Sequence, residues 1–234
     1  MFTIAVTTAP RPTGVTYLPK AIASLRRAGI HDVVHVFAEP HSVLPADDSL
    51  VLHDAWDRQG CFQNWARAAR WFLSEDTADW LLVLQDDCLW RNDAGKILRQ
   101  AVTDFSASAT LGFLSPYTSK AMLPEERVRA AARGQGEETW CDAKFHGNAF
   151  WGAVATLWPR ASLRQVVESP RFVAHTHTRK VDVVIGNCCR DLDRDILVRC
   201  PSLATHAGAV STLGRDKIPN IQWGRVGFGY RATR

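Results

Sequence analysis

Short apolar runs alternate with segments of helical periodicity along the chain, and this alternation limits the available folds more than any other feature. Residues 2–8 (FTIAVTT) are rich in β-branched residues and end before two prolines and a glycine, which predicts a strand. Residues 16–30 carry apolar side chains at helical spacing, and residues 32–40 form a second apolar run closed by proline. A strand, a helix and a strand in this order predict parallel strands covered by helices.

The same alternation continues over the rest of the chain. We expect helices over 60–75, 93–105, 160–169 and 181–192, strands over 79–87, 110–116, 148–159 and 195–203, and a short helix over 124–134 inside a long insertion, 117–147. No repeat or low-complexity segment interrupts this pattern. The sequence therefore predicts an α/β fold in which helices flank a mostly parallel central sheet. We expect one domain over 1–214, with a basic C-terminal tail over 215–234 packed on it or extending from it.

Composition and charge are those of an ordinary globular protein. The chain has 234 residues, 46% of them hydrophobic and 22% charged, which is enough for one large domain. The net charge of +4 is too small by itself to indicate nucleic acid. Residues 211–234 carry five basic residues and one acid, an excess as large as that of the whole chain, so this tail is a candidate for phosphate contacts.

Several features favour a soluble intracellular protein. No run reaches the roughly 20 apolar residues of a membrane span, and residues 1–12 lack the basic region and long apolar core of a secretion signal. The six cysteines form no CxxC pair, which favours free thiols in a reducing compartment. We therefore expect a cytoplasmic location.

Residues 81–90 (LLVLQDDCLW) follow an unbroken apolar run with two acids, Asp86 and Asp87. Adjacent carboxylates repel each other and resist desolvation, so they are expected where a cation or a substrate compensates for them. Ligands of open α/β sheets bind beyond the carboxyl ends of the strands, where these two acids lie. The pair suits Mg²⁺ or Mn²⁺, which use one or two carboxylates and leave positions for phosphates and water. The alternative is that Asp86 caps a turn and Asp87 is solvated.

Two other segments bring polar residues to the same edge of the predicted sheet. Thr7, Thr8 and Arg11 follow the first strand and offer hydroxyl groups and a guanidinium to a nucleotide. His206 lies in a polar turn, residues 201–214, directly after the last apolar strand. A neutral imidazole can bind Mn²⁺, so His206 is a candidate third ligand. A hydrogen-bonded structural histidine is the alternative.

Four stretches in this order resemble glycosyltransferases of the GT-A type. They are residues 4–30, the QDD at 85–87, residues 152–163 (GAVATLWPRASL) and residues 201–214 (PSLATHAGAVSTLG). They are most similar to small bacterial and phage members that have a TTxPR sequence at the end of the first strand, a DD version of the DXD motif and a C-terminal PSLxxHxGxxS motif. The resemblance extends from residue 2 to about residue 214. Gln85 departs from it, because related motifs often carry an acid there.

The resemblance implies a GT-A fold and the transfer of a sugar from a nucleotide-diphosphate donor, with a UDP-sugar preferred and Mn²⁺ or Mg²⁺ as cofactor. A metal on the diphosphate would stabilise the negative charge that grows as the glycosidic bond breaks. The implied roles are metal binding by Asp87 and His206, a contact of Asp86 with the donor sugar or ribose, and other donor contacts by Thr7, Thr8, Arg11 and Asn64. The chain would act in the cytoplasm of a bacterium, or of the host if a phage encodes it.

Asp182 is the candidate general base for the acceptor hydroxyl. It opens a predicted helix on the acceptor side, where GT-A enzymes that invert the anomeric centre commonly place a catalytic carboxylate. The alternative is a helix N-terminal acid stabilised by the helix dipole. Glu137, Glu138 and Asp142 are weaker candidates, in a segment that resembles a mobile loop closing over the donor. The acceptor stays open between a saccharide, a protein and a hydroxymethylated base in DNA, and the oligomeric state is not indicated.

Two other functions remain as alternatives. A sugar-phosphate nucleotidyltransferase would use the same sheet edge, but such enzymes usually have a glycine-rich phosphate loop, and residues 7–14 (TTAPRPTG) contain one glycine. A zinc or nucleic-acid module would use the HTH at 175–177 with Cys188 and Cys189. Adjacent cysteines are poorly placed to share one tetrahedral zinc ion, so the spacing gives this alternative little support.

Overall fold

The computed structural model describes residues 2–11, 14–118, 122–123, 127, 138–143, 145, 150, 152–175 and 180–207. The basic tail over 215–234 and the domain boundary at 214 lie outside the described residues, as does the helix expected over 124–134 except for Arg127. None of the helices in these described ranges is long and apolar enough to cross a membrane.

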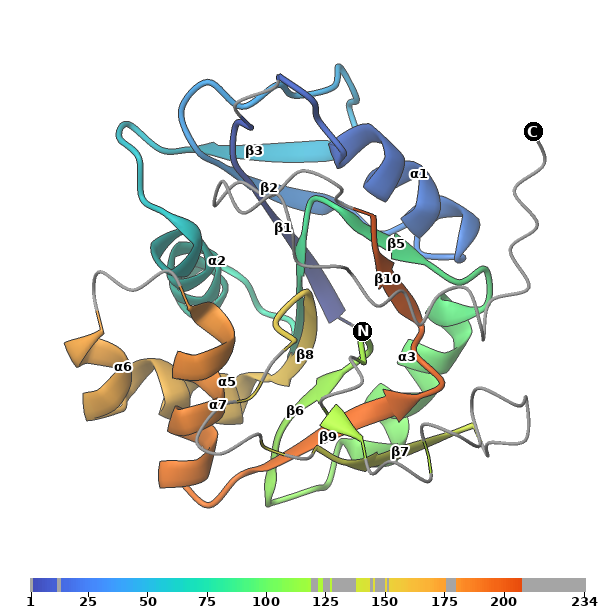
Figure 1. Ribbon diagram of the computed structural model, residues 1–234, viewed down its shortest axis with the longest axis vertical. Helices are drawn as coiled ribbons and strands as arrows, with labels where there is room; N and C mark the ends of the chain where they lie inside the picture. Colours follow the sequence, from blue (N-terminus) through green and yellow to red (C-terminus); the bar gives the residue numbers. More distant parts are fainter. Residues whose placement is uncertain are drawn as a thin grey trace.

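An eight-stranded sheet forms the centre of the described structure (Figure 1), in the order β3-β2-β1-β4-β8-β6-β9-β7. Its strands are β1 (Phe2–Thr8), β2 (Val34–Ala38), β3 (Leu50–Asp54), β4 (Trp80–Gln85), β6 (Leu111–Ser115), β7 (Thr139–Asp142), β8 (Ala155–Pro159) and β9 (Asp195–Cys200). β8 pairs antiparallel with β4 and β6, and β7 pairs antiparallel with β9. The other neighbours are parallel. The predicted α/β class with a mostly parallel sheet is therefore confirmed.

Helices cover both faces of the sheet (Figure 1). The described helices are α1 (Leu18–Arg27), α2 (Cys61–Glu75), α3 (Ala94–Phe105), α5 (Arg160–Glu168), α6 (Pro170–Ala174) and α7 (Val181–Asp191). One core contains residues of α2, α5, α6 and α7, and the other contains residues of α1 and α3. These two cores explain the apolar run of β4, because Leu81 lies in the first and Leu82 in the second. A strand buried on both faces needs apolar side chains at every position.

A second sheet of two antiparallel strands lies beside the main one, formed by β5 (Cys88–Trp90) and β10 (Ala204–His206). These strands, with β3 and β7, were not expected from the sequence. β3 is the outer strand of the main sheet, and its Val51 and Leu52 are both exposed, so it shows no alternation of buried and exposed positions. Two expectations are corrected. In the strand expected over 148–159, the described residues 150 and 152–154 lie outside β8. β4, expected to be a central parallel strand, is parallel to β1 but antiparallel to β8.

Candidate functional site

The acidic turn lies at the carboxyl edge of the sheet, beside the end of β1. Parallel pairing of β1 with β4 places Thr7 opposite Gln85, so the two strands end at the same level. The backbone N–H of Asp86 donates to the Thr7 carbonyl at 3.1 Å. Asp86 and Asp87 then form the turn between β4 and β5. The expectation that residues of the first strand meet this turn is confirmed.

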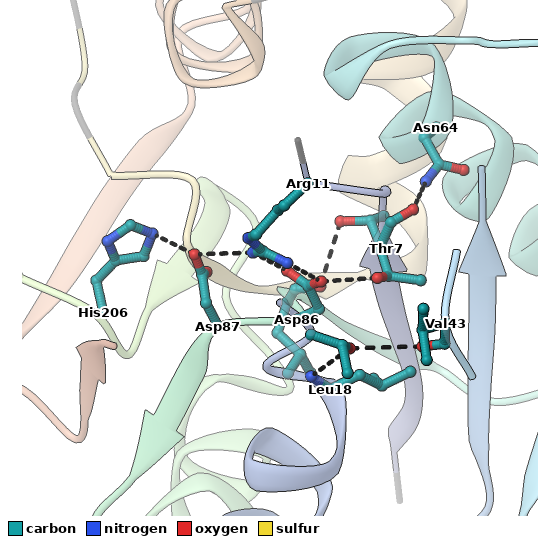
Figure 2. Close-up of polar contacts among 11 residues, drawn as sticks. Thr7, Arg11, Leu18, Val43, Asn64, Asp86, Asp87 and His206 are labelled. Carbon is teal, nitrogen blue, oxygen red and sulfur yellow. Dashed lines mark hydrogen bonds and ion pairs between the residues drawn. The ribbon is translucent and has the colours of Figure 1, made fainter. Parts of the chain in front are cut away.

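Arg11 is the main partner of Asp86 (Figure 2). Its Nη1 donates to Asp86 Oδ2 at 2.7 Å and its Nη2 to Asp86 Oδ1 at 2.7 Å. The Thr8 hydroxyl donates to Asp86 Oδ2 at 2.7 Å, and Arg11 also lies over the Tyr17 ring. Asp86 is 4% exposed and Arg11 7%. A bidentate, charge-assisted pair of this kind compensates the buried Asp86 carboxylate.

Asp87 is paired with His206 (Figure 2), and the small second sheet brings them together. β10 pairs with β5 so that His206 lies opposite Cys88, and the Ala207 N–H donates to the Asp87 carbonyl at 2.8 Å. His206 Nε2 lies 2.9 Å from Asp87 Oδ2, which Arg11 Nη2 also contacts at 3.3 Å. The structure therefore joins Asp86, Asp87, Arg11 and His206 in one network, in which His206 is the least buried member, with a side chain that is 25% exposed.

The pKa values of this pair follow from burial and charge. Burial acts to raise the pKa of Asp87, but the hydrogen bond and charge of His206, with the charge of Arg11, outweigh it and leave the pKa below its ordinary value. Burial acts to lower the pKa of His206, but the hydrogen bond and charge of Asp87 outweigh it and leave the pKa above its ordinary value. The charged forms of both side chains thus stabilise each other.

One oxygen of this network lacks a partner. Asp87 is 5% exposed, and its Oδ1 atom is buried and accepts no hydrogen bond. A buried carboxylate oxygen is normally satisfied, so this atom marks a position for a donor or a cation. A carboxylate and an imidazole also suit Mn²⁺. No group of three or more His, Cys, Asp or Glu able to hold a metal occurs within the described ranges.

The other predicted donor contacts lie around the same edge. The Thr7 hydroxyl is half-buried and donates to the Leu84 carbonyl at 3.4 Å. Asn64, on the first turn of α2, is 2% exposed, and its Nδ2 donates to the carbonyls of Thr8 and Phe37 at 3.3 and 2.8 Å. Asn64 therefore fixes α2 against the ends of β1 and β2. Its Oδ1 is buried without a partner.

Glu39 is a buried acid of this edge that the sequence analysis did not select. It directly follows β2 and is 3% exposed, and its N–H donates to the Thr8 carbonyl at 3.0 Å. Its Oε1 accepts from the Gly60 N–H, immediately before α2, and its Oε2 lies 3.9 Å from Arg58 Nε. The sequence contains the pattern that would have identified Glu39, because it is an acid directly after an apolar strand, in FAEP at residues 37–40. The same pattern identified Asp86.

Asp182 lies in the first turn of α7. Its Oδ1 accepts from the Val183 N–H at 3.0 Å. Burial raises the pKa of Asp182, and the backbone N–H groups of Val183, Asp182 and Gly152 oppose this only in part. Burial and then the charges of Asp182, Glu39, Asp87 and Asp86 raise the pKa of the Cys61 thiol to about 12.

The weaker candidates for the base lie elsewhere. Glu138 accepts from Arg91 Nη2 at 3.1 Å and from Arg199 Nη2 at 3.0 Å, so two arginines compensate it. Asp142 is the exposed last residue of β7, and Glu137 lies outside the described residues. Of the acids considered as bases, Asp182 is the one that acts electrostatically on the same thiol as Asp86 and Asp87.

An open pocket adjoins Arg11 on the side of α1. Residues 8–11 and 14–16, which follow β1, form one wall, and His41 and Val43, which follow β2, form the other. The Thr16 hydroxyl donates to the Val43 carbonyl at 3.4 Å and joins the two walls (Figure 2). The pocket has a volume of about 80 Å³, so it can take a small group beside Arg11 but not a whole nucleoside.

The residues proposed for a zinc module are not arranged as one in the described structure. All six cysteines are free, and Cys188 and Cys189 are residues of α7 that are buried in the core. His175 is exposed at the end of α6, whereas residues 176–177 lie outside the described residues.

Comparison with solved structures found a similar fold in the crystal structure of mannose-1-phosphate geranyltransferase from Thermus thermophilus. The two chains superpose with a TM-score of 0.53 over 85% of this chain and 73% of that chain, at 12% sequence identity. Comparison with protein-family models found no match, and comparison with curated proteins found none. The similarity supports the single α/β fold already described, and at this identity it extends to the fold alone.

Proposed function

We propose that the chain is a metal-dependent glycosyltransferase that moves a sugar from a nucleotide-diphosphate donor to an acceptor hydroxyl. The observation that carries the proposal is the paired network at the sheet edge, in which Arg11 binds Asp86 and His206 binds Asp87. The network leaves a buried carboxylate oxygen, Asp87 Oδ1, without a partner. Open α/β sheets bind ligands at this edge.

Asp87 and His206 are the residues that would hold Mn²⁺ or Mg²⁺. A bound divalent ion would neutralise the charge that develops on the leaving diphosphate. With Asp87 and His206 as two ligands, the other positions are left to phosphate oxygens and water, as is usual for these ions. Pairing with Asp87 favours the charged form of His206, so His206 must lose the Nε2 proton, and with it the hydrogen bond to Asp87, when both bind the ion. Arg11 then remains to hold Asp87 in place.

Arg11 and the adjoining pocket are the proposed donor site. The guanidinium lies between the acidic turn and the pocket walls, so it can contact a diphosphate while Asp86 fixes its orientation. The small pocket formed by the loops after β1 and β2 would hold one end of the donor. Thr8 and Asn64 are positioning residues. The Thr8 hydroxyl donates a hydrogen bond to Asp86, and Asn64 fixes α2 against the ends of β1 and β2.

Asp182 is the proposed general base. We expect Asp182→Asn to lower kcat by about 10²- to 10⁴-fold while nucleotide affinity stays nearly unchanged, because the amide cannot accept the proton of the acceptor hydroxyl. A base works only when it is deprotonated, and burial raises the pKa of Asp182. Activity should therefore fall on acidification at a pH above that of an ordinary aspartate titration. Turnover against pH and nucleotide binding by calorimetry measure the two effects.

Asp191→Asn is the matched control for this prediction, since Asp191 is an exposed acid at the other end of α7. It should leave turnover and its pH dependence unchanged. If Asp182→Asn weakens donor binding but leaves normal turnover at saturating donor, Asp182 is not the base. If it only lowers thermal stability, Asp182 is a helix N-terminal acid.

A sugar-phosphate nucleotidyltransferase is the second candidate, favoured by the structural neighbour, which is named as a transferase of mannose-1-phosphate. It would use the same acidic turn and metal. We rank it second because the loop after β1 turns its Arg11 side chain back onto Asp86 and Asp87. A loop that wraps a nucleoside triphosphate would instead be rich in glycine.

Product analysis separates the two reactions. UDP- and GDP-sugars incubated with the protein and Mn²⁺ should release the nucleoside diphosphate, slowly to water and faster once an acceptor is present. Pyrophosphate formed from a sugar 1-phosphate and a nucleoside triphosphate, with no diphosphate released from any nucleotide sugar, would establish the second candidate and refute the first.

A further inference from the structure

Two histidines meet on β2 and β3, at one edge of the main sheet. The two strands pair in parallel, which places His35 opposite Val51 and His53 opposite Phe37. Because side chains alternate along each strand, His35 and His53 are diagonal neighbours on one face of the sheet. His35 Nδ1 lies 3.1 Å from His53 Nε2, which is a hydrogen-bonding distance. This bond links β3 to β2 through side chains as well as through the backbone.

Aromatic rings and an arginine pack against this histidine pair. The His53 ring stacks on the Phe37 ring with centroids 4.4 Å apart, and the Trp71 ring of α2 lies 4.2 Å from the His35 ring. Arg67, also on α2, donates through Nη2 to the His53 carbonyl and lies over the Phe37 ring. The pair is therefore half-buried between the two strands and α2, with a fixed positive charge beside it.

The contact between the two rings limits how many protons the pair can hold. A hydrogen bond between imidazoles needs one nitrogen with a proton and one without, so it survives the addition of one proton but not of two. Two added protons would place two N–H groups and two like charges 3.1 Å apart. Burial lowers the pKa of both histidines, and the charges of His35 and Arg67 lower the pKa of His53 further. Two acids, Asp54 and Asp76, oppose these effects only in part.

β3 has little other support in the described structure. As the outer strand it pairs on one side only, with β2, and its Val51 and Leu52 are 42% and 47% exposed. A strand with one neighbour and little apolar burial opens locally at a lower free energy than the central strands of a sheet. A side-chain contact that links β3 to β2 therefore weighs heavily in keeping this strand in place.

The loop after β3 connects this strand to the carboxyl edge of the sheet. The Ala55 N–H donates to the Ala38 carbonyl at 3.0 Å, and the Gly60 N–H donates to Glu39, the residue that follows Ala38. The loop 56–59 is therefore held at its two ends by neighbouring residues. When β3 separates from β2, the contact of Ala55 opens and the loop loses one of these two anchors.

We propose that His35 and His53 form a pH-sensitive latch, which holds β3 on β2 while at least one ring is unprotonated and opens when acid protonates both. In the open form the two rings bind protons near the ordinary histidine value of about pH 6.5, whereas the closed pair resists them. Acid therefore favours the open form. The stability of β3 is fully present above about pH 6.5 and is lost as the pH falls below it. This inference does not depend on the proposed function.

Amide hydrogen exchange of the native chain tests the latch. The reporters are the amides of Val34 and Ala55, which donate to the carbonyls of Ser49 and Ala38 at the two ends of the β2–β3 ladder. Each proton that only the open form binds raises the opening equilibrium up to tenfold per pH unit, so protection, corrected for the intrinsic exchange rate, should fall by about tenfold or more from pH 7 to pH 5. Protection that stays constant over this range would overturn the proposal.

His53→Phe assigns the effect to the histidine pair, because phenylalanine keeps a ring against Phe37 but binds no proton. It removes one of the two protons, so about half of the fall in protection at Ala55, on a logarithmic scale, should disappear. His31→Gln is the matched control, since His31 is an exposed histidine shortly before β2, and it should keep the native pH dependence. The same fall in His53→Phe as in the native chain would refute the latch.

NMR titration of the native chain needs no variant to fold. The Cε1 protons of His35 and His53 should both titrate at a lower pH than the histidines of the chain unfolded in urea. The Val34 and Ala55 amides should lose protection over the same pH range. Titration of both rings at or above the unfolded value would contradict the proposal, whatever the variants do.

Discussion

Asp87→Asn is expected to lower kcat/KM by about 10³-fold or more. The substitution keeps the size of the side chain but removes the charge that Asp87 contributes to the metal site, and transition-state stabilisation by a metal amounts to several kcal/mol. In the native chain Asp87 is buried, is bonded to His206 at 2.9 Å and has one unpartnered oxygen. The substitution should also make nucleotide affinity insensitive to Mn²⁺. Steady-state kinetics and calorimetry with and without Mn²⁺ measure both effects.

Asp93→Asn is the matched control for Asp87→Asn. Asp93 lies a few residues further on, is also paired with an arginine, Arg91, and has a side chain that is 52% exposed. Its substitution should change kcat/KM less than about twofold, because an exposed ion pair contributes little. If the turnover of Asp87→Asn is within tenfold of the native value and still depends on Mn²⁺, Asp87 is not a ligand of the metal.

Arg11→Met is expected to lower the free energy of unfolding by about 3–5 kcal/mol, the cost of leaving one partner of a buried ion pair uncompensated. The side chains of Arg11 and Asp86 are 3% and 6% exposed, and two bonds of 2.7 Å join them. Methionine keeps most of the length and apolar surface of arginine, so the loss reports the missing charge. Urea denaturation followed by tryptophan fluorescence measures it. Donor binding should be lost as well, because Arg11 is the proposed diphosphate contact.

Two comparisons make this prediction specific. Arg171→Met breaks the exposed pair of Arg171 with Asp191, whose side chains are 37% and 42% exposed, and should cost no more than about 1 kcal/mol. The double variant Arg11→Met with Asp86→Asn should recover part of the loss, since it removes the uncompensated carboxylate. If Arg11→Met costs no more than Arg171→Met, the Arg11–Asp86 pair does not stabilise the fold as described.

The central strands and their helices were predictable because burial requires apolar runs in the strands and apolar residues at helical spacing in the helices. β1, β2, β4 and β6 are apolar and end near the expected residues. The sequence of β3 shows no such apolar pattern, because both faces of this strand are partly exposed. β5 and β10 are three residues each, and pairing between distant segments stabilises them rather than local preference.

The members of the site were predictable one by one, but their pairing was not. Each of Arg11, Asp86, Asp87 and His206 lies at or just after the end of a predicted strand, so the rule for strand ends brings them to one edge. That Arg11 binds Asp86 depends on a contact between residues 75 positions apart, which no local pattern records. His206 was expected in a polar turn, and the structure places it in β10. Glu39 followed the same rule and was overlooked because a single acid before proline also suits a turn.

The central claim is that Asp87 and His206 hold a divalent ion that contacts the donor diphosphate. The most direct test is the crystal structure of the protein with UDP and Mn²⁺, in which anomalous scattering locates the manganese independently of the refined atoms. We predict one peak at bonding distance from an Asp87 carboxylate oxygen, His206 Nε2 and a phosphate oxygen. UDP bound with no manganese at Asp87, while the Asp87–His206 hydrogen bond remains intact, would contradict the claim.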